Sequence, residues 1–215
     1  MARACLIDVY DTILDSGFHA RTRELTALAG ADAAGWYAEW NRQHTERDLG
    51  LLSVEESFAR LLRASGIDPR PDLVAGLAEM DTELLAAHAR LYDDTIPFLT
   101  ELRARGIWIA LVSNCSEHTR QLLNDLGVAS LADAVILSCE VAAVKPSPEI
   151  YHRALSDLDV APADALMVDD QPSYCAGARA AGVKAVQMVR PDVEERLPRS
   201  DFPVVHSLMD VIPLL

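Results

Sequence analysis

The feature that most constrains the fold of this chain is a repeated order of elements in its second half: an amphipathic helical segment, a glycine and a short apolar run. In "FLTELRARGIWIALVS" (residues 98–113), Gly106 marks the predicted helix end, because the residue after a helix often needs a positive φ angle. The apolar runs are continuous, which is typical of strands buried on both faces. Strands that alternate with helices predict a parallel α/β sheet. The predicted strands lie within residues 5–8, 107–113, 134–138, 165–170 and 184–189.

Residues 16–92 break this order and contain no convincing strand. Their apolar spacing predicts four helices, within residues 22–30, 33–50, 53–66 and 72–91. Ser53 and Glu56 have the spacing of a capping box at the start of the third. We therefore predict a Rossmann-like α/β core formed by residues 1–15 and 93–215. A helical insert (residues 16–92) would lie over the sheet edge where the first strand ends.

The composition limits the possible partners. Half of the 215 residues are hydrophobic, enough to bury a full core, and the net charge is −14. This charge argues against nucleic acid, whose phosphates need basic surfaces, and against anionic membranes. No apolar stretch approaches the ~18 residues that span a bilayer, and the four cysteines are scattered as in reduced cytoplasmic proteins. We expect a cytoplasmic monomer or homodimer that acts on a small molecule.

Polar side chains follow four of the predicted strands at the points where the strands end. They are Asp8 after the first, Ser113 and Asn114 after the second, Lys145 in the loop after the third, and Asp169 and Asp170 after the fourth. Ligands of open α/β sheets bind at the carboxyl ends of the strands. A carboxylate there can act as a nucleophile, two carboxylates suit Mg²⁺, and a serine and a lysine suit phosphoryl oxygens.

Four segments in this order resemble the four motifs of the haloacid dehalogenase superfamily, and together they cover essentially the whole chain. They are "DVYDT" (8–12), "LVSN" (111–114), "KPSPEIY" (145–151) and "VDDQPSYCAGARAAG" (168–182). The helical insert resembles the small helical cap of that family. The resemblance implies a hydrolase with a Rossmann-like core.

The resemblance also implies a role for each matching residue. Asp8 is then the nucleophile that forms a covalent ester or acylphosphate, and Lys145 pairs with it and with the substrate. Thr12 and Ser113 hold the transferred group, with Asn114 nearby.

Mg²⁺ is the cofactor that the fourth motif implies. Asp169 then ligates the ion and Asp170 supports it. Asp8 and the backbone carbonyl of Tyr10 complete the protein ligands, since any residue at position 10 supplies a carbonyl.

Tyr10 departs from the phosphatase pattern. Phosphatases of the family usually carry a second aspartate at this place, which protonates the leaving alcohol. The family's 2-haloacid dehalogenases carry tyrosine instead, and their leaving halide needs no proton. Those dehalogenases use no metal and lack the aspartate pair at 169–170. Asp11, one position further on, should point elsewhere and is not expected to replace the missing acid.

Three functions remain open at this point. The favoured one is a Mg²⁺-dependent phosphatase of a small phosphorylated metabolite that forms an aspartyl-phosphate. It would be slow on alkyl phosphates, since general acid–base help is typically worth ~10²–10⁴-fold. The alternatives are a metal-free 2-haloacid dehalogenase with an aspartyl-ester intermediate, and a binding or regulatory protein whose catalysis has decayed.

Other residues have a functional and a structural interpretation. Arg42 lies near the place of the carboxylate-binding arginine of the dehalogenases, which makes it a candidate substrate ligand. Trp36 and Trp40 have i,i+4 spacing and are predicted to lie in the core of the helical insert. Tyr151 matches a tyrosine of the dehalogenases, but packing in the core is the favoured interpretation.

Overall fold

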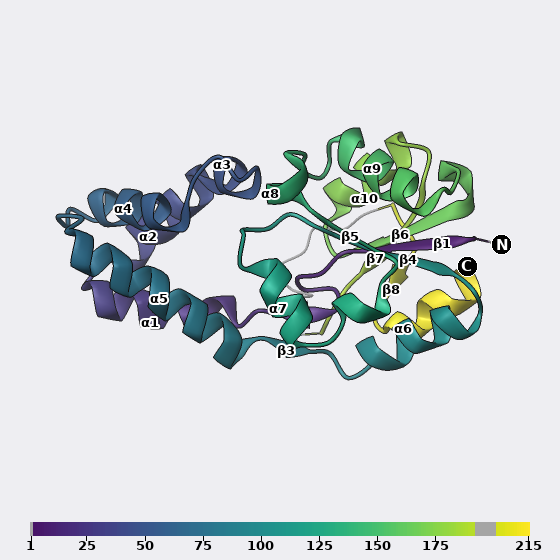
Figure 1. The fold of residues 1–215 in the computed structure, drawn as a ribbon, viewed down its shortest axis with the longest axis horizontal. Coiled ribbons are helices and arrows are strands. Elements are labelled where there is room, and N and C mark those ends of the chain that lie inside the picture. The colour runs from purple at the N-terminus through teal and green to yellow at the C-terminus, as the bar shows by residue number, and fades with distance from the viewer. Residues whose placement is uncertain (1, 192–200) are drawn as a thin grey trace.

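The computed structural model of the protein describes residues 2–191 and 201–215, and a six-stranded parallel sheet lies at its centre (Figure 1). The strand order is β5-β4-β1-β6-β7-β8. The strands are β1 (Ala4–Ile7), β4 (Trp108–Ser113), β5 (Ala134–Leu137), β6 (Ala165–Asp169), β7 (Lys184–Met188) and β8 (Val204–Val205). The predicted α/β fold is confirmed, with β8 as an additional short edge strand.

Helices cover both faces of this sheet (Figure 1). They are α6 (Thr95–Ala104), α7 (Thr119–Asp125) and the 3₁₀ helices η1 (Ala129–Leu131) and η4 (Leu208–Leu214) on one face, with α9 (Pro148–Leu158) and α10 (Pro172–Ala180) on the other. A short helix α8 (Ser138–Val141) follows β5, and the 3₁₀ helix η2 (Pro162–Asp164) precedes β6.

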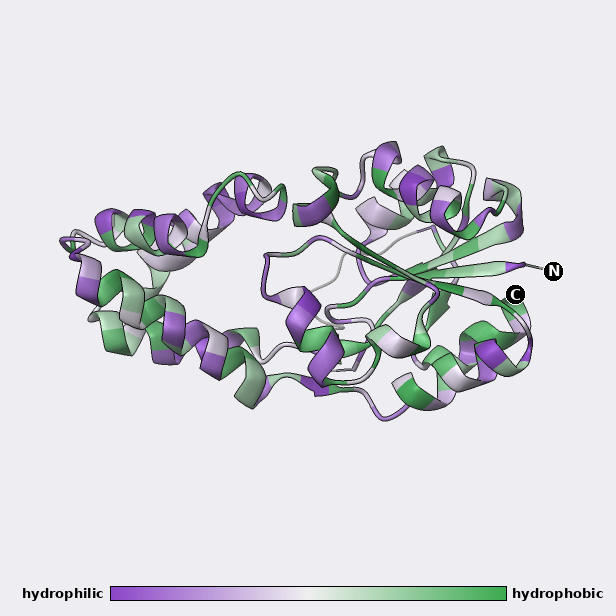
Figure 2. Cartoon of the chain, viewed as in Figure 1, coloured by the Kyte–Doolittle hydropathy of each residue, from purple (hydrophilic) through white to green (hydrophobic). Residues whose placement is uncertain are grey.

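Strand β1 shows why the sequences of these strands are continuous apolar runs. Cys5 and Ile7 pack in the hydrophobic cluster on the α6 face, whereas Ala4 and Leu6 pack in the cluster on the α9 face. All four residues are fully buried. Figure 2 shows the same pattern across the central strands, which are mostly apolar along their length. Burial on both faces therefore requires apolar residues at successive positions.

The helical insert contains five helices rather than the four predicted. They are α1 (Phe18–Ala29), α2 (Ala33–Arg42), α3 (His44–Asp48), α4 (Val54–Ala64) and α5 (Pro71–His88). The second predicted helix is interrupted at Gln43, which ends α2 and begins α3. The serine half of the predicted capping box of α4 is present, with Ser53 accepting a hydrogen bond from the Glu56 amide at 3.1 Å, whereas the Glu56 carboxylate pairs with Arg60. Helices α1, α2, α4 and α5 surround a hydrophobic cluster of their own, which includes Trp36 and Phe58.

Two short strands join the helical insert to the rest of the chain. Strand β2 (Leu14–Asp15) pairs antiparallel with β3 (Arg90–Leu91), so that Leu14 lies opposite Leu91. Neither strand was predicted, and β3 falls in the range for which no strand was expected. The insert extends from the sheet on the side where β2 and β3 lie (Figure 1).

The helical insert also touches the core through the end of α3 and the loop that follows it. The hydroxyl of Ser138 donates a hydrogen bond to the Asp48 carbonyl at 2.6 Å. Gly50 has a φ of 70°, and a Cβ at this position would lie 2.6 Å from the Cys139 carbonyl oxygen. Glycine is therefore needed here both for its backbone conformation and for the close approach.

No helix in the described part of the chain is long and apolar enough to cross a membrane.

Candidate active site

Three buried carboxylates meet at the carboxyl ends of two neighbouring strands. Asp8 follows β1, Asp169 ends β6, and Asp170 comes next. The two strands pair in parallel, and the Asp8 amide continues the ladder by donating to the Val168 carbonyl at 2.9 Å. Each carboxylate offers an oxygen that lies within 4.8 Å of the others. The parallel register thus brings together residues that are 161 positions apart (169 − 8).

Lys145 lies between two of these carboxylates. Its Nζ is 2.5 Å from Asp8 Oδ1 and 2.8 Å from Asp169 Oδ2, and its side chain is completely buried. Burial alone lowers the pKa of an amine, but the charges of Asp169 and Asp8 outweigh it, so that the pKa of Lys145 is raised. Lys145 is therefore held as a cation.

One lysine does not balance the charge of three carboxylates. Burial raises the pKa of Asp169 to about 7. Burial, with the charges of Asp8 and Asp169 nearby, raises the pKa of Asp170 to about 9. The cluster therefore has a deficit of positive charge, and a divalent cation with oxygen ligands fits it.

The loop that carries Lys145 is fixed from two sides. Asn114 Nδ2 donates to the Lys145 carbonyl at 2.9 Å, and Asn114 Oδ1 accepts from the Lys145 amide at 2.7 Å. On the other side, a Cβ at Gly177 of α10 would lie 2.4 Å from the Pro146 carbonyl oxygen, so only glycine allows α10 to pack this closely. The ring of Tyr174 lies 4.9 Å from Lys145 Nζ. Asn114 thus contacts the main chain that presents the lysine.

The two predicted hydroxyl groups are buried near the strand ends. Ser113 ends β4 and is completely buried, with its Oγ 3.4 Å from the Asn114 carbonyl. Thr12 is also fully buried, and its Oγ1 has no hydrogen-bond partner among the described residues. The Thr12 carbonyl accepts two bonds from Arg190, of 3.1 and 2.6 Å. Arg190 in turn forms two bonds with Asp94, of 3.0 and 2.9 Å.

Tyr10 and Asp11 lie at the turn after the first strand. The Tyr10 hydroxyl is 2.8 Å from Thr119 Oγ1, and burial raises the pKa of Tyr10, so the phenol stays protonated. Asp11 has a φ of 58°, and its amide donates to the Leu14 carbonyl at 2.8 Å. Glycine is the residue most often found with a positive φ angle, so an aspartate with this backbone conformation is unusual.

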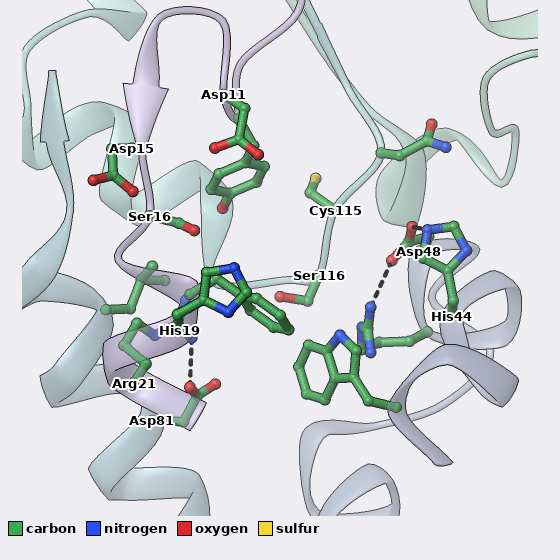
Figure 3. A pocket seen from close by; sticks show the side chains of 16 residues that line it. Asp11, Asp15, Ser16, His19, Arg21, His44, Asp48, Asp81, Cys115 and Ser116 are labelled. Atoms are coloured by element: carbon green, nitrogen blue, oxygen red, sulfur yellow. Dashed lines mark hydrogen bonds and ion pairs between the residues drawn. The ribbon is translucent and has the colours of Figure 1, made fainter. Parts of the chain in front are cut away.

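A cavity of about 280 Å³ lies between the strand ends and the helical insert. It is lined by Tyr10, Asp11, Asp15, Ser16, Phe18, His19, Arg21, Trp40, His44, Arg47, Asp48, Asp81, Leu85, Asn114, Cys115 and Ser116. Figure 3 shows Asp11 and Asp15 on the side of the turn, with His44 and Asp48 across from them. The carboxylate cluster itself does not line the cavity. Three lining residues lie next to the cluster: Tyr10 and Asp11 follow Asp8 in the sequence, and Asn114 bonds to the Lys145 main chain.

The structure does not bring Arg42 to this cavity. Its side chain is 69% exposed at the end of α2, where it pairs with Glu39 at 3.2 Å. Arg47, five residues further on, lines the cavity instead. The continuous helix predicted over residues 33–50 did not indicate this, because the interruption at Gln43 places Arg47 on a separate helix.

The two tryptophans of α2 have different environments. Trp36 is 1% exposed and lies in the hydrophobic cluster of the helical insert, as predicted. Trp40 is only partly buried, lines the cavity, and has the Arg47 guanidinium 3.8 Å from its ring centroid. Tyr151 is fully buried in the cluster on the α9 face, and the predicted core position is confirmed.

Known proteins resemble this chain along nearly its whole length. The family model for haloacid dehalogenase-like hydrolases matches residues 2–182. The chain is 30% identical to the glyceraldehyde 3-phosphate phosphatase of Methanopyrus kandleri, covering 98% of this chain and 94% of that protein. It is 37% identical to the phosphoserine phosphatase of Thermus thermophilus, with 92% and 87% covered. The structure of the L-2-haloacid dehalogenase of Xanthobacter autotrophicus has the same fold, with a TM-score of 0.71, 21% identity and coverage of 100% and 98%.

Proposed function

The chain belongs to the haloacid dehalogenase-like hydrolases, and we propose that it is a Mg²⁺-dependent phosphatase of a small phosphorylated metabolite. The observation that carries the proposal is the cluster of Asp8, Asp169 and Asp170 around Lys145. A metal-free dehalogenase has no need for three carboxylates at one point. The names of the curated relatives, which include phosphatases of a triose phosphate and of phosphoserine, support the same choice.

In the proposed reaction, an Asp8 oxygen attacks the phosphorus atom of the substrate. The bond between phosphorus and the ester oxygen breaks, the alkoxide leaves, and Asp8 carries the phosphoryl group. Water then attacks that phosphorus and releases inorganic phosphate and the free carboxylate. Lys145 holds the Asp8 carboxylate in place and offsets charge, and Ser113 and Thr12 supply hydroxyls for the transferred group.

Asp8, Asp169 and Asp170, with the carbonyl of Tyr10, are the proposed ligands of Mg²⁺. When bound, the ion would neutralise charge on the phosphoryl oxygens, which is the main requirement of phosphoryl transfer. Asp169 Oδ1 already accepts a bond from the Gln171 amide at 2.9 Å, and Asp170 Oδ2 accepts one from Gln171 Nε2 at 2.6 Å. These bonds orient both carboxylates.

We propose further that residues 1–15 and 93–215 form the core that carries out the chemistry, and that residues 16–92 form a cap. The cavity between the strand ends and the helical insert supports this division. Substrates would enter that cavity with the phosphoryl group toward Asp8.

Tyr10 keeps the 2-haloacid dehalogenase as a second candidate. Its phenol is bonded to Thr119 and supplies no carboxylic acid for a leaving alcohol. A halide needs no such acid, so the first motif on its own fits dehalogenation.

A panel of phosphate esters and 2-haloacids, each assayed with Mg²⁺ and with EDTA, tests the proposal. Phosphate release that requires Mg²⁺ is the expected result. Halide release that persists in EDTA would establish the dehalogenase instead. No turnover in either assay, with ligand binding retained, would identify a binding protein whose catalysis has decayed.

A further inference from the structure

Arg47 is a buried cation of the cavity that combines an unmet hydrogen-bond donor with a weak ion pair. Arg47 lies on α3, its side chain is 10% exposed, and it lines the cavity. Its guanidinium lies 3.8 Å from the centroid of the Trp40 ring, which supports it from one side. Its Nη1 atom has no hydrogen-bond partner among the described residues. A buried donor without a partner destabilises the protein until a ligand satisfies it.

The carboxylate that pairs with Arg47 is Asp48, which lies at a long distance and also pairs with His44. Arg47 Nη2 is 3.5 Å from Asp48 Oδ1, beyond the usual 2.7–3.2 Å of a hydrogen bond. Asp48 also has His44 Nε2 at 3.1 Å from its other oxygen. Burial lowers the pKa of Arg47, but arginine remains charged in proteins. The guanidinium is thus a cation with incomplete compensation.

The other arginine of the cavity is better matched. Arg21 Nη2 bonds directly to Asp81 Oδ1, a carboxylate with no other ion pair among the described residues. Its Nε atom lacks a partner, but the charge of the side chain is balanced. On the same side, Asp15 accepts a bond from the Gly17 amide at 2.8 Å. Figure 3 shows this side with Asp15, Arg21 and Asp81, across the cavity from Asp48.

The end of α3 is fixed to the core, which gives Arg47 a defined position. The Asp48 carbonyl accepts the Ser138 hydroxyl at 2.6 Å, and the same hydroxyl accepts the Cys115 amide at 2.9 Å. Cys115 directly follows Asn114, which holds the Lys145 main chain. A short series of bonds therefore connects the arginine segment to the loop beside the carboxylate cluster.

We propose that Arg47 binds a carboxylate at the end of the substrate remote from the phosphoryl group. The substrate class is then the small phosphate monoesters of hydroxy acids, and this inference rests on the proposed function. A planar guanidinium matches the geometry of a carboxylate, and the two opposite charges compensate each other. A substrate hydroxyl at the same place would leave the charge of Arg47 uncompensated.

The size and charge of the cavity favour small substrates with a single remote negative charge. At about 280 Å³ the cavity is slightly smaller than typical ligand sites, which span roughly 300–1,000 Å³. A second phosphate would bring two negative charges beside Asp48, Asp11 and Asp15, all of which line the cavity. A single carboxylate adds one charge and fits the incompletely paired guanidinium of Arg47.

Matched substrate pairs test this inference. The pairs are 2-phosphoglycolate with 2-hydroxyethyl phosphate, and 3-phosphoglycerate with glycerol 3-phosphate, in which a carboxylate replaces a CH₂OH group. The proteins are the wild type, Arg47→Met, Arg47→Lys, Arg42→Met and, as a control on an exposed helix position, Arg63→Met. kcat and KM are measured for each substrate with Mg²⁺.

We expect the wild type to prefer the carboxylate member of each pair. Arg47→Met should lower kcat/KM for that member by roughly ten- to a hundredfold, the size of a charged hydrogen bond, mainly through KM. The alcohol members should change little, which also shows that the variant is folded. Arg47→Lys should retain part of the preference, because it keeps the charge but loses the planar fork.

Two results would overturn the inference. One is an equal loss on both members of each pair in Arg47→Met; the other is a selective loss in Arg42→Met instead. Calorimetric binding of the same four compounds to the Asp8→Asn protein separates this inference from the proposed function, because it needs no turnover. Failure of all hydrolysis with carboxylate-selective, Arg47-dependent binding would remove the phosphatase and leave the arginine site in place.

Discussion

The side chain of Asn114 exchanges two hydrogen bonds with the main chain of Lys145, one at 2.9 Å and one at 2.7 Å. Asn114 follows β4 and Lys145 lies in the loop that leads to α9. The side-chain amide of Asn114 thus satisfies both the carbonyl and the N–H of Lys145, because it carries an NH₂ donor and a carbonyl acceptor side by side. We infer that this pairing helps to place the lysine ammonium between Asp8 and Asp169.

Replacing Asn114 by aspartate should therefore weaken catalysis through Lys145. The Nδ2 donor becomes an oxygen that faces the Lys145 carbonyl, so two acceptors meet and a bond is lost. We expect kcat to fall about 10- to 100-fold, corresponding to ~1–3 kcal/mol for an unsatisfied buried group. Steady-state kinetics on p-nitrophenyl phosphate measure this, with Asn124→Asp on α7 as the control. Unchanged kcat would show that Lys145 does not need the contact.

Asp8→Asn should abolish hydrolysis while the fold survives. The amide has nearly the same shape as the carboxylate but cannot act as the nucleophile. Asp72→Asn, at an exposed position of α5, is the matched control. Circular dichroism checks the fold and phosphate release checks activity. An Asp8→Asn protein that kept most of its activity would remove the covalent mechanism.

Mg²⁺ binding should depend on Asp169. The side chain is completely buried, and its loss removes one of three converging carboxylates. Isothermal titration calorimetry at neutral pH should detect Mg²⁺ binding to the wild type and little or none to Asp169→Asn. If the wild type itself bound no Mg²⁺, the phosphatase would be excluded and the dehalogenase favoured.

Tyr10→Asp should raise activity on alkyl phosphates by on the order of tenfold or more, because it supplies an acid for the leaving alcohol. Aryl phosphates should gain less, since their leaving groups need no proton. Tyr10→Phe is the matched control, because it also breaks the bond to Thr119 without adding an acid. The measurement compares kcat/KM on p-nitrophenyl phosphate and on an alkyl phosphate. No gain on the alkyl ester in a folded, Mg²⁺-binding Tyr10→Asp protein would mean that the missing acid does not limit this site.

The metal-free protein should lose stability as the pH rises. The pKa is raised to about 7 for Asp169 and to about 9 for Asp170, against ~3.9 for an aspartate in an unfolded chain. Between about pH 4 and pH 9 the folded protein therefore holds protons that the unfolded chain has released, and its free energy of unfolding falls with pH. Urea unfolding in EDTA at several pH values measures this slope. Asp170→Asn should flatten it, and an identical slope in both proteins would contradict the assignment.

Much of the core could be predicted because its strands are buried on both faces. Continuous apolar runs such as the one before Asp8 are typical of strands whose successive side chains pack against helices on both faces of the sheet. The two-residue strands β2, β3 and β8 could not be predicted, because two residues carry no periodic signal. These strands form because β2 pairs with β3 and β8 pairs with β7, and neither pairing can be predicted from the sequence.

The helical insert shows a second feature that could not be predicted from the sequence, which is how its helices are arranged. Amphipathic spacing indicates the helices but not their relative directions, and the interruption at Gln43 changes which arginine reaches the cavity. Arg42 ends α2 in solvent, whereas Arg47 lies against Trp40. A helix-breaking signal was absent, since glutamine is a good helix former. Tertiary contacts of α3 with the core decide this point.

The antiparallel pair of β2 and β3 places the beginning and the end of the helical insert opposite each other, with Leu14 facing Leu91. When the ends of a segment are already joined in this way, a change in the length of its interior adds little closure entropy. Insertions, deletions or exchange of the whole segment then leave the register of the parallel sheet undisturbed. The length and sequence of residues 16–92 can therefore change without displacing the strands that carry the proposed nucleophile and metal ligands.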